Sequence, residues 1–282
     1  VAAPRALQEL VHAAYADASV STAHPTFGVR LVDTDEEPVI FIDDERVNVD
    51  STGHLYEDLQ RELTYGLLQR LAPRYLLIHA GAVRMDDLAL LIPGDHDSGK
   101  SSLSLGIGQI GSFYSDDVTP IDPATVTPRP FPRELVLHSG TRQRLADLGI
   151  GHLAPPTPCC RFGGYDYLTA TQAGLSWAEP APIGGLIFPR RQSGVAPKLT
   201  PLTPGEVARR LLEQCFDLQQ LGEAATEVVA TLAECPSVEV DFDAADQVTQ
   251  LLPHWAGQLA LGQFTSTDVV VGGALDRGNV DD

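Results

Sequence analysis

The stretch from Tyr75 to Asp117 is YLLIHAGAVRMDDLALLIPGDHDSGKSSLSLGIGQIGSFYSDD. Its middle part, Gly94 to Ser101, fits the phosphate-loop pattern G-x-x-x-x-G-K-[ST]. The apolar run from Leu88 to Ile92 precedes the loop and predicts a buried strand, and the residues from Ser101 to Ile107 predict the start of a helix. A strand, a glycine loop and a helix in this order are the context in which the pattern indicates a phosphate site.

Backbone geometry explains why this pattern suits phosphate. Glycines let several N–H groups turn inward around phosphate oxygens, and the following helix adds the partial positive charge of its N-terminus. We expect Lys100 to place its charge on the outer phosphates and the Ser101 hydroxyl to bind a magnesium ion. A chance glycine turn before a helix is the alternative. The expected nucleotide-binding residues are Gly94, Asp95, His96, Asp97, Ser98, Gly99, Lys100, Ser101 and Ser102.

Two adjacent acids follow the next expected strand. Residues 111–115 predict that strand, and Asp116 and Asp117 come directly after it. An acid at the end of a strand beside the loop strand can reach the magnesium, and a second acid next to it can take a proton from an incoming hydroxyl. A solvated turn is the alternative, but the position after a phosphate loop favours a functional role.

A histidine lies upstream of the loop. His79 ends an apolar run within the strand expected from Tyr75 to Val83, and the small residues Ala80, Gly81 and Ala82 follow it. The imidazole could orient one of the acids or a phosphate. A histidine on an apolar strand is also compatible with a purely structural place in the core.

The rest of the chain predicts further helices and strands. Leucines four residues apart predict a helix over residues 54–72 that ends at Pro73. Alternating apolar residues predict a small antiparallel sheet within residues 25–50 and a last strand over residues 238–242. Residues 5–17 place apolar side chains on one helical face and predict an N-terminal helix.

Two features lie in the second half of the chain. The run from Ile183 to Phe188 predicts a buried strand, and Arg190 and Arg191 follow it. Arginines just past a strand are candidates for stabilising charge on a phosphoryl group during transfer. Residues 203–206 form a capping box with proline at the first helical position, which predicts a helix to about residue 216.

These elements suggest three parts. Residues 1–73 are expected to form an N-terminal helix and a small antiparallel β subdomain that ends in a helix. Residues 74–262 are expected to form the core that carries the loop, and residues 263–282, rich in glycine and aspartate, a tail. The chain shows no internal repeat and no inter-domain linker.

Composition excludes several classes of protein. The 282-residue chain carries a formal net charge of −19, which argues against nucleic-acid binding because that function needs a basic surface. No apolar run approaches the roughly 18 residues of a membrane span, and the N-terminal residues carry acids and do not resemble a secretory signal. We therefore expect a cytoplasmic protein with no membrane contact.

The order of His79, the loop and the aspartate pair resembles that of the HPr kinase/phosphorylase group, within the phosphoenolpyruvate-carboxykinase-like fold. Further stretches are similar to HPr-kinase-like proteins, among them TVTPRPFPREL and LTPLTPGEVARRLLEQ. The resemblance implies a mixed α/β fold with a largely antiparallel central sheet flanked by helices. The parallel sheet that a phosphate loop alone would suggest is therefore not expected.

The resemblance also implies roles for the site residues. Lys100 and Ser101 would contact the phosphates and magnesium of ATP. One aspartate would bind the metal and the other act as base; we take Asp117 as the metal ligand beside Ser101, although the two could exchange roles. His79 would support the acids, and Arg190 would be the arginine of the Arg190-Arg191 pair that acts on the transferring group. The expected catalytic residues are thus Asp116, Asp117, Lys100, His79 and Arg190.

The chain also departs from the family. His96 and Asp97 stand in the loop where small or apolar residues are usual. Added negative charge beside a triphosphate is unfavourable unless metal or solvent screens it. The C-terminal signature by which HPr kinases hold their protein substrate has no clear counterpart, so HPr is not expected as the partner.

These inferences lead to one main function and two alternatives. The first is an ATP- and magnesium-dependent kinase that acts on a hydroxyl of a peptide, a small protein or a small molecule, with a serine as one candidate. The second is a nucleotide-responsive binding or regulatory module without turnover. The third is the reverse reaction, a phosphorylase or phosphatase. The resemblance also favours an assembly of several copies of the chain, that is, a homo-oligomer.

Overall fold

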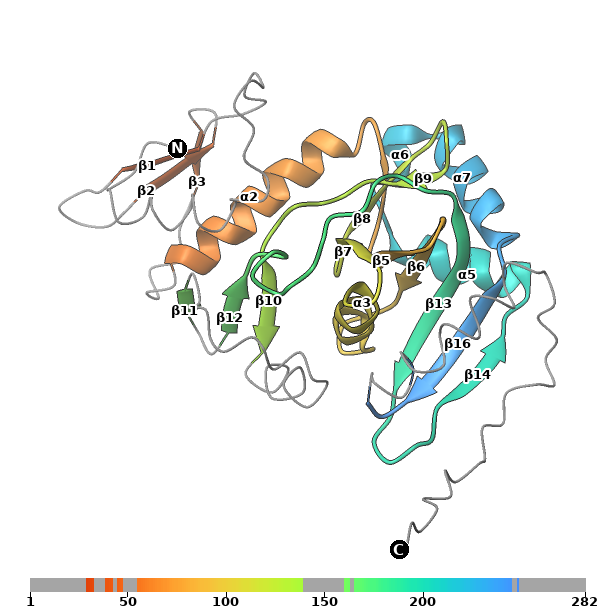
Figure 1. Cartoon of the computed structure of the whole chain (residues 1–282). Coiled ribbons are helices and arrows are strands. Elements are labelled where there is room, and N and C mark those ends of the chain that lie inside the picture. Colours follow the sequence, from red (N-terminus) through yellow and green to blue (C-terminus); the bar gives the residue numbers. More distant parts are fainter. Residues whose placement is uncertain are drawn as a thin grey trace, which may run out of the picture.

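The computed structural model of the chain describes residues 29–32, 39–42, 45–47, 55–138, 160–162, 165–244 and 248 (Figure 1). Helices and mixed parallel and antiparallel sheets are combined, which confirms the expected mixed α/β class. The expected helix over residues 5–17 and the expected tail over residues 263–282 lie outside the described residues. Within the described residues, no helix combines the length and the apolar character that crossing a bilayer requires.

A six-stranded sheet forms the centre of the fold. Its strand order is β14-β16-β13-β6-β5-β7. β13 pairs in parallel with both β6 and β16, and the other three pairs are antiparallel. The sheet is therefore mixed and mainly antiparallel, as expected. The strands are β5 (Ala80–Met85), β6 (Leu88–Pro93), β7 (Ser112–Ser115), β13 (Ile183–Arg191), β14 (Lys198–Pro201) and β16 (Ser237–Phe242).

Strand direction brings distant parts of the chain to one edge of this sheet. β5 is antiparallel to both β6 and β7, so β5 begins at the edge where β6 and β7 end. β13 and β16 run parallel to β6 and end at the same edge. The segments that meet there are residues 79, 94–100, 116–117, 190–192 and 242–243.

Helices cover both faces of the sheet (Figure 1). Along β5 and β6 the side chains alternate between the faces. Val83, Leu90 and Ile92 pack in one buried cluster with α3 (Lys100–Gly108). Ala82 and Leu91 pack in another with α5 (Pro204–Gln214) and α7 (Glu223–Ala233). The glycine loop is therefore fixed between a buried strand and a helix with an almost fully buried first residue.

One sequence expectation was wrong at His79. The predicted single strand from Tyr75 to Val83 is two strands, β4 (Leu76–Ile78) and β5, which belong to different sheets. The chain changes sheet at His79, where the backbone N–H donates to the carbonyl oxygen of Gln214 at 2.7 Å. The second sheet has the order β15-β4-β8-β9 and contains β8 (Thr119–Asp122), β9 (Thr127–Pro128) and β15 (Cys215–Phe216).

The sequence suggested that the acids follow the strand directly beside the loop strand, and the structure shows that they do not. β7 carries the acids at its end and pairs with β5, so β5 separates β7 from β6. The acids still reach the loop edge because β6 and β7 run in the same direction.

The remaining elements surround this core. α2 (Leu55–Leu71) confirms the helix expected over residues 54–72, and three antiparallel strands confirm the sheet expected within residues 25–50. Those strands are β1 (Val29–Val32), β2 (Val39–Ile42) and β3 (Glu45–Val47). A further sheet contains β10 (Leu135–His138), β12 (Tyr165–Leu168) and β11 (Cys160–Phe162), and the short helix α6 (Leu218–Leu221) precedes α7.

The turn from α3 into β7 supplies a test of the packing that places the acids. A Cβ atom on Gly111 would lie 2.1 Å from the carbonyl oxygen of Arg84 in the neighbouring strand. We expect Gly111→Ala to lower the free energy of unfolding by about 2 kcal/mol or more, because backbone has to move. Gly205→Ala is the matched control, since nothing lies within 4 Å of a Cβ there. In denaturant unfolding the control should be neutral or slightly stabilising, and equal losses in both variants would contradict the described turn.

Candidate functional site

The glycine loop between β6 and α3 contains two residues with positive φ angles. Gly99 adopts a left-handed φ of 103°, and Asp97 adopts a φ of 60°. A Cβ on Gly99 would lie 2.5 Å from the ring of Phe242. Both the left-handed backbone and the lack of space for a side chain therefore require glycine at this position. The side chains of Asp95, His96 and Asp97 are exposed at the tip of the loop.

Lys100 lies under this loop with only 5% of its surface exposed. Its Nζ donates to the carbonyl oxygen of Asp95 at 2.9 Å. Burial lowers the pKa of Lys100, although the nearby carboxylates, with Asp117 and Asp116 the strongest, oppose that change. Ser98 Oγ is also buried in the loop and has no hydrogen-bond partner among the described residues. The loop thus holds a buried cation and a spare hydroxyl, groups that anionic phosphate oxygens could satisfy.

Asp117 contacts a guanidinium group and an imidazole ring. Its Oδ2 lies 2.8 Å from Arg133 Nη2, and its Oδ1 lies 3.2 Å from His79 Nε2. Burial acts to raise the pKa of Asp117, but the hydrogen bond from His79 and the charges of Arg133, His79 and Lys100 outweigh burial and hold that pKa well below its usual range. Asp117 is therefore ionised at neutral pH and remains partly accessible, with 29% of its side chain exposed.

His79 connects Asp117 to the loop. Its Nδ1 lies 3.0 Å from Gln214 Oε1, and Gln214 Nε2 donates to Asp95 Oδ1 at 2.7 Å. Because the Gln214 amide gives its NH₂ to Asp95, its oxygen faces His79, so Nδ1 is the donor in that contact. The side chains Asp95, Gln214, His79, Asp117 and Arg133 form one continuous series of contacts, which we call the polar chain.

Asp116 differs from its neighbour. It is 4% exposed, and burial raises its pKa, with the negative charge of Asp117 adding to that rise. Arg133 and a hydrogen bond from the Ser101 side chain act in the opposite direction. The Ser101 hydroxyl, which the sequence assigned to the metal, therefore contacts Asp116. The geometry favours exchanging the two expected roles, with Asp116 beside the metal and Asp117 toward the substrate.

The two expected arginines have different contacts. Arg190 contacts Asp241 Oδ2 at 2.8 Å and Glu239 Oε1 at 3.3 Å, so its charge is already matched. Arg191 forms no ion pair among the described residues; its Nε donates to the carbonyl oxygen of Asp243 at 3.2 Å. The backbone N–H of Arg191 donates to the carbonyl oxygen of Ser98 at 3.1 Å and ties the end of β13 to the loop. Arg191 is thus better placed than Arg190 to meet an added negative charge.

A cavity of about 450 Å³ lies on the outer side of the loop. Gly94 to Ser98 form one wall, and arginines from the end of β13 and from α5 form the other. Both α5 arginines pair with acids, Arg209 with Glu213 at 2.6 Å and Arg210 with Glu239 at 2.8 Å. We call this space the loop cavity; its volume is in the range of small-molecule sites.

The residues present are compatible with magnesium held together with phosphate. Within the described residues, no group of three or more His, Cys, Asp or Glu side chains could hold a metal by itself. Magnesium is usually held by one or two protein oxygens together with water and substrate phosphates, so Ser101 and Asp116 are a sufficient pair. Ser102 follows in the first turn of α3 and is half-buried.

Sequence reasoning left two members of the polar chain without a definite role. Arg133 is one of several arginines in a proline-rich stretch, and its contact with Asp117 depends on the tertiary fold. Gln214 is the last residue of α5 and lies 135 positions after His79, so no local pattern could identify it. Comparison of the chain with protein-family models and with curated proteins found no match.

The adjacent acids should respond in opposite ways to loss of charge. The raised pKa of Asp116 means that the folded state disfavours its ionised form, a cost that is absent below the unfolded pKa of about 3.9 and grows as pH rises above it. We expect Asp116→Asn to raise the melting temperature at pH 7, and this gain to vanish near pH 3. Thermal unfolding across this pH range measures it.

We expect Asp117→Asn to lower the stability of the protein at neutral pH, which is the opposite of the effect expected for Asp116→Asn. The lowered pKa of Asp117 contributes stability that is present above the unfolded pKa of about 3.9 and is lost as pH falls toward the folded value. The variant leaves Arg133 and His79 without their anion, so a loss of about 1–3 kcal/mol is expected at neutral pH. Urea unfolding at pH 7 checks it, and an unchanged midpoint would contradict the contacts described for Asp117.

Proposed function

We propose that the protein is an ATP- and magnesium-dependent kinase that transfers the γ-phosphate to a hydroxyl acceptor. The observation that supports the proposal best is the meeting of the glycine loop, buried Lys100, the Asp116-Asp117 pair and His79 at one edge of the sheet. Positioning and charge neutralisation are the main requirements of phosphoryl transfer, and these groups supply both. The resemblance to HPr-kinase-like proteins agrees with this function.

The loop side of the site would hold the nucleotide. Backbone N–H groups from Gly94 to Gly99 and the N-terminus of α3 face anionic oxygens in such loops. Lys100 would exchange its contact with the Asp95 carbonyl for a phosphate oxygen, which offsets the cost of its burial. Arg191 would stabilise negative charge that develops during transfer. The loop cavity is large enough for part of a nucleotide.

Ser101 and Asp116 would hold the magnesium ion. When bound, the ion neutralises charge on the phosphates and orients them. Asp116 is buried beside Ser101, and a cation there removes the penalty that raises the pKa of the carboxyl. The same cation would screen the acidic loop residues Asp95 and Asp97.

Asp117 would orient and deprotonate the acceptor. In the proposed step the hydroxyl oxygen of the acceptor bonds to the γ-phosphorus, the bond from that phosphorus to the bridging oxygen breaks, and ADP leaves. The hydroxyl proton passes to Asp117, and His79 and Arg133 hold this carboxylate in place. A weakly basic carboxylate suffices where the transition state is loose and little proton transfer precedes bond formation.

A second candidate is a nucleotide-responsive binding module without turnover. Its support is the acidic tip of the loop, where Asp95 is engaged by Gln214, together with arginines that pair with acids. Nucleotide binding without formation of ADP or phosphorylated product would favour this candidate. The reverse reaction remains a third candidate; release of pyrophosphate from a phosphorylated product and added phosphate would identify it.

Other features are proposals on the same basis. An ATP-dependent activity suits a cytoplasmic protein, and the acceptor is a peptide, small protein or small molecule with no role for nucleic acid or membrane. The HPr-kinase resemblance supports a homo-oligomer, which sedimentation would test.

Replacing the loop lysine tests the nucleotide site. Lys100→Met keeps the length of the side chain and removes a buried charge, so the free protein should melt at the same or a higher temperature. In the wild-type protein, MgATP at about 100 times its Kd should stabilise the fold by about 2.7 kcal/mol, a shift of several degrees. The variant should lose this shift and all transfer of phosphate from ATP.

Lys198→Met is the matched control because Lys198 is exposed on β14. It should keep the MgATP-dependent shift. A wild-type protein that does not respond to MgATP, or a Lys100→Met protein that still does, would refute the proposed site.

A further inference from the structure

An exposed aromatic side chain lies beside the polar chain. Phe216 belongs to β15, the edge strand of the second sheet, and is 39% exposed. The centroid of its ring lies 6.0 Å from that of His79, and the centroid of the His96 ring lies 5.3 Å from that of His79. We call Phe216, His79 and His96 the ring cluster. The cluster connects an apolar surface group to the proposed catalytic carboxylate, because His79 contacts Asp117.

The ring cluster presents ring surface more than hydrogen-bonding groups. Both nitrogens of its central ring are engaged, since His79 Nδ1 lies 3.0 Å from Gln214 Oε1 and Nε2 lies 3.2 Å from Asp117 Oδ1. Phe216 has no polar atom in its side chain. The rings are tilted relative to one another, which leaves edges and faces open to a further ring. Apolar and aromatic groups gain most from contact with such a surface.

Exposed apolar side chains gather near the polar chain. Four large apolar side chains are exposed among the described residues: Tyr65, Ile110, Leu212 and Phe216. Two of these, Leu212 and Phe216, lie two positions before and two positions after Gln214, the residue that joins His79 to the loop. A single exposed apolar residue is ordinary, but apolar surface that continues into a site indicates what the site binds.

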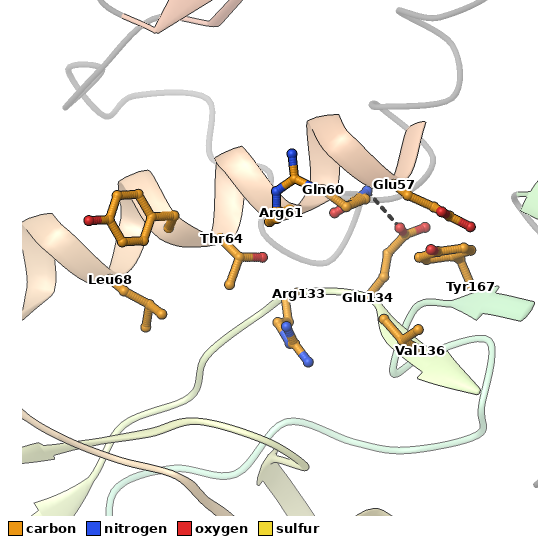
Figure 2. A pocket seen from close by; sticks show the side chains of 10 residues that line it. Glu57, Gln60, Arg61, Thr64, Leu68, Arg133, Glu134, Val136 and Tyr167 are labelled. Carbon is orange, nitrogen blue, oxygen red and sulfur yellow. Dashed lines mark hydrogen bonds between the residues drawn. The ribbon is translucent and has the colours of Figure 1, made fainter. Parts of the chain in front are cut away.

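The acceptor has two possible routes to Asp117. A cavity of about 360 Å³ lies between α2 and residues 133–136 (Figure 2). Arg133 lines this cavity, and Figure 2 shows its guanidinium pointing away from α2. That guanidinium contacts Asp117 Oδ2 at 2.8 Å, so it stands between the cavity and the carboxylate. The other carboxylate oxygen faces His79, and the acceptor hydroxyl therefore reaches Asp117 along the ring cluster.

The distances within the cluster suit an extended peptide. Phe216 is linked to Asp117 by two short contacts, 6.0 Å between ring centroids and 3.2 Å from His79 to the carboxylate. In an extended chain, side chains two residues apart lie about 7 Å apart and point to the same side. The cluster is open surface, whereas sites for small molecules are usually concave and enclose most of the ligand. A peptide segment laid across the rings is therefore the occupant that fits.

We propose that the ring cluster binds an extended acceptor peptide with an aromatic or large apolar side chain two residues from the phosphorylated serine or threonine. The proposal rests on the kinase function proposed above. The apolar side chain packs on Phe216 and the neighbouring ring of His79, and the hydroxyl lies against Asp117. Phe216 thus determines which hydroxyl is accepted, while the polar chain positions the carboxylate that receives its proton.

Matched peptides test the apolar requirement. Three hexapeptides with blocked termini contain one serine among alanines, and two of them carry phenylalanine two residues before or two residues after the serine. In ligand-observed NMR with nucleotide-free protein, one phenylalanine peptide should bind about 5- to 20-fold more tightly than the alanine peptide, because part of an aromatic side chain is buried. Equal binding of all three peptides would overturn the proposal.

A small aromatic alcohol tests the commitment to a peptide. Phenylpropanol carries a ring and a hydroxyl without a peptide backbone, and it should bind more weakly than the better phenylalanine peptide. Equally tight binding of phenylpropanol would overturn the assignment of the cluster to a peptide.

Protein variants locate the contact. Phe216→Ala should reduce the preference for phenylalanine to less than about 2-fold and leave binding of the alanine peptide unchanged, the result that a double-mutant cycle gives for a direct contact. Ile110→Ala is the matched control, because Ile110 is exposed and lies outside the ring cluster. It should keep the full preference. Melting temperatures show whether the variants are folded, and Phe216→Leu, which fills much of the same space, replaces Phe216→Ala if the latter does not fold. An undiminished preference in the folded Phe216 variant would overturn the assignment.

The last arm separates this proposal from the kinase function. The binding assays contain no nucleotide, so failure of the nucleotide site would appear in the Lys100→Met experiment and not in the peptide preference. With MgATP and wild-type protein, mass spectrometry should detect phosphate on the serine of the better phenylalanine peptide, with a KM about 5- to 20-fold below that of the alanine peptide and a similar kcat. Binding without phosphorylation, in protein that also binds MgATP, would overturn the role of the ring cluster as the acceptor surface.

Discussion

The pairing direction of three strands determines the candidate site. β5 runs antiparallel between β6 and β7, so the start of one strand and the ends of two others lie at one edge of the sheet. Two parallel pairings then bring β13 and β16 to the same edge. Backbone hydrogen bonds alone thus place His79, the glycine loop, the Asp116-Asp117 pair and the arginines near one another. The side chains that cover the sheet need only keep this arrangement rigid.

Charge is concentrated at this edge at a cost to stability. Lys100 and Asp116 are both almost fully buried, and burial shifts the pKa of each toward its neutral form. A protein optimised only for stability would avoid such groups. Under the proposed function, a bound nucleotide and metal would supply opposite charges that offset this cost. The polar chain has a separate role, because its contacts keep Asp117 ionised.

Local patterns predicted much of the fold and drew attention to several residues of the candidate site. The strand and the helix that flank the loop and the capping box at Thr203 each depend on residues close in sequence, and the structure contains them as expected. The break at His79 could not be predicted, because the apolar run continues through it and the cause is a bond to Gln214. The contacts of Arg133 and Gln214 likewise depend on packing between distant segments. The same limit applies to the arginine pair, because only the fold shows that Asp241 and Glu239 contact Arg190 and not Arg191.

The central claim is that the loop above Lys100 holds a magnesium nucleotide within reach of the two aspartates. A crystal structure with Mg²⁺ and a non-hydrolysable ATP analogue tests it most directly. We expect the phosphates inside the loop, Lys100 Nζ on a phosphate oxygen instead of the Asp95 carbonyl, and a metal about 2.1 Å from Ser101 Oγ with Asp116 beside it and Asp117 facing the γ-phosphate. An analogue bound elsewhere, or a metal remote from Ser101 and both aspartates, would contradict the account.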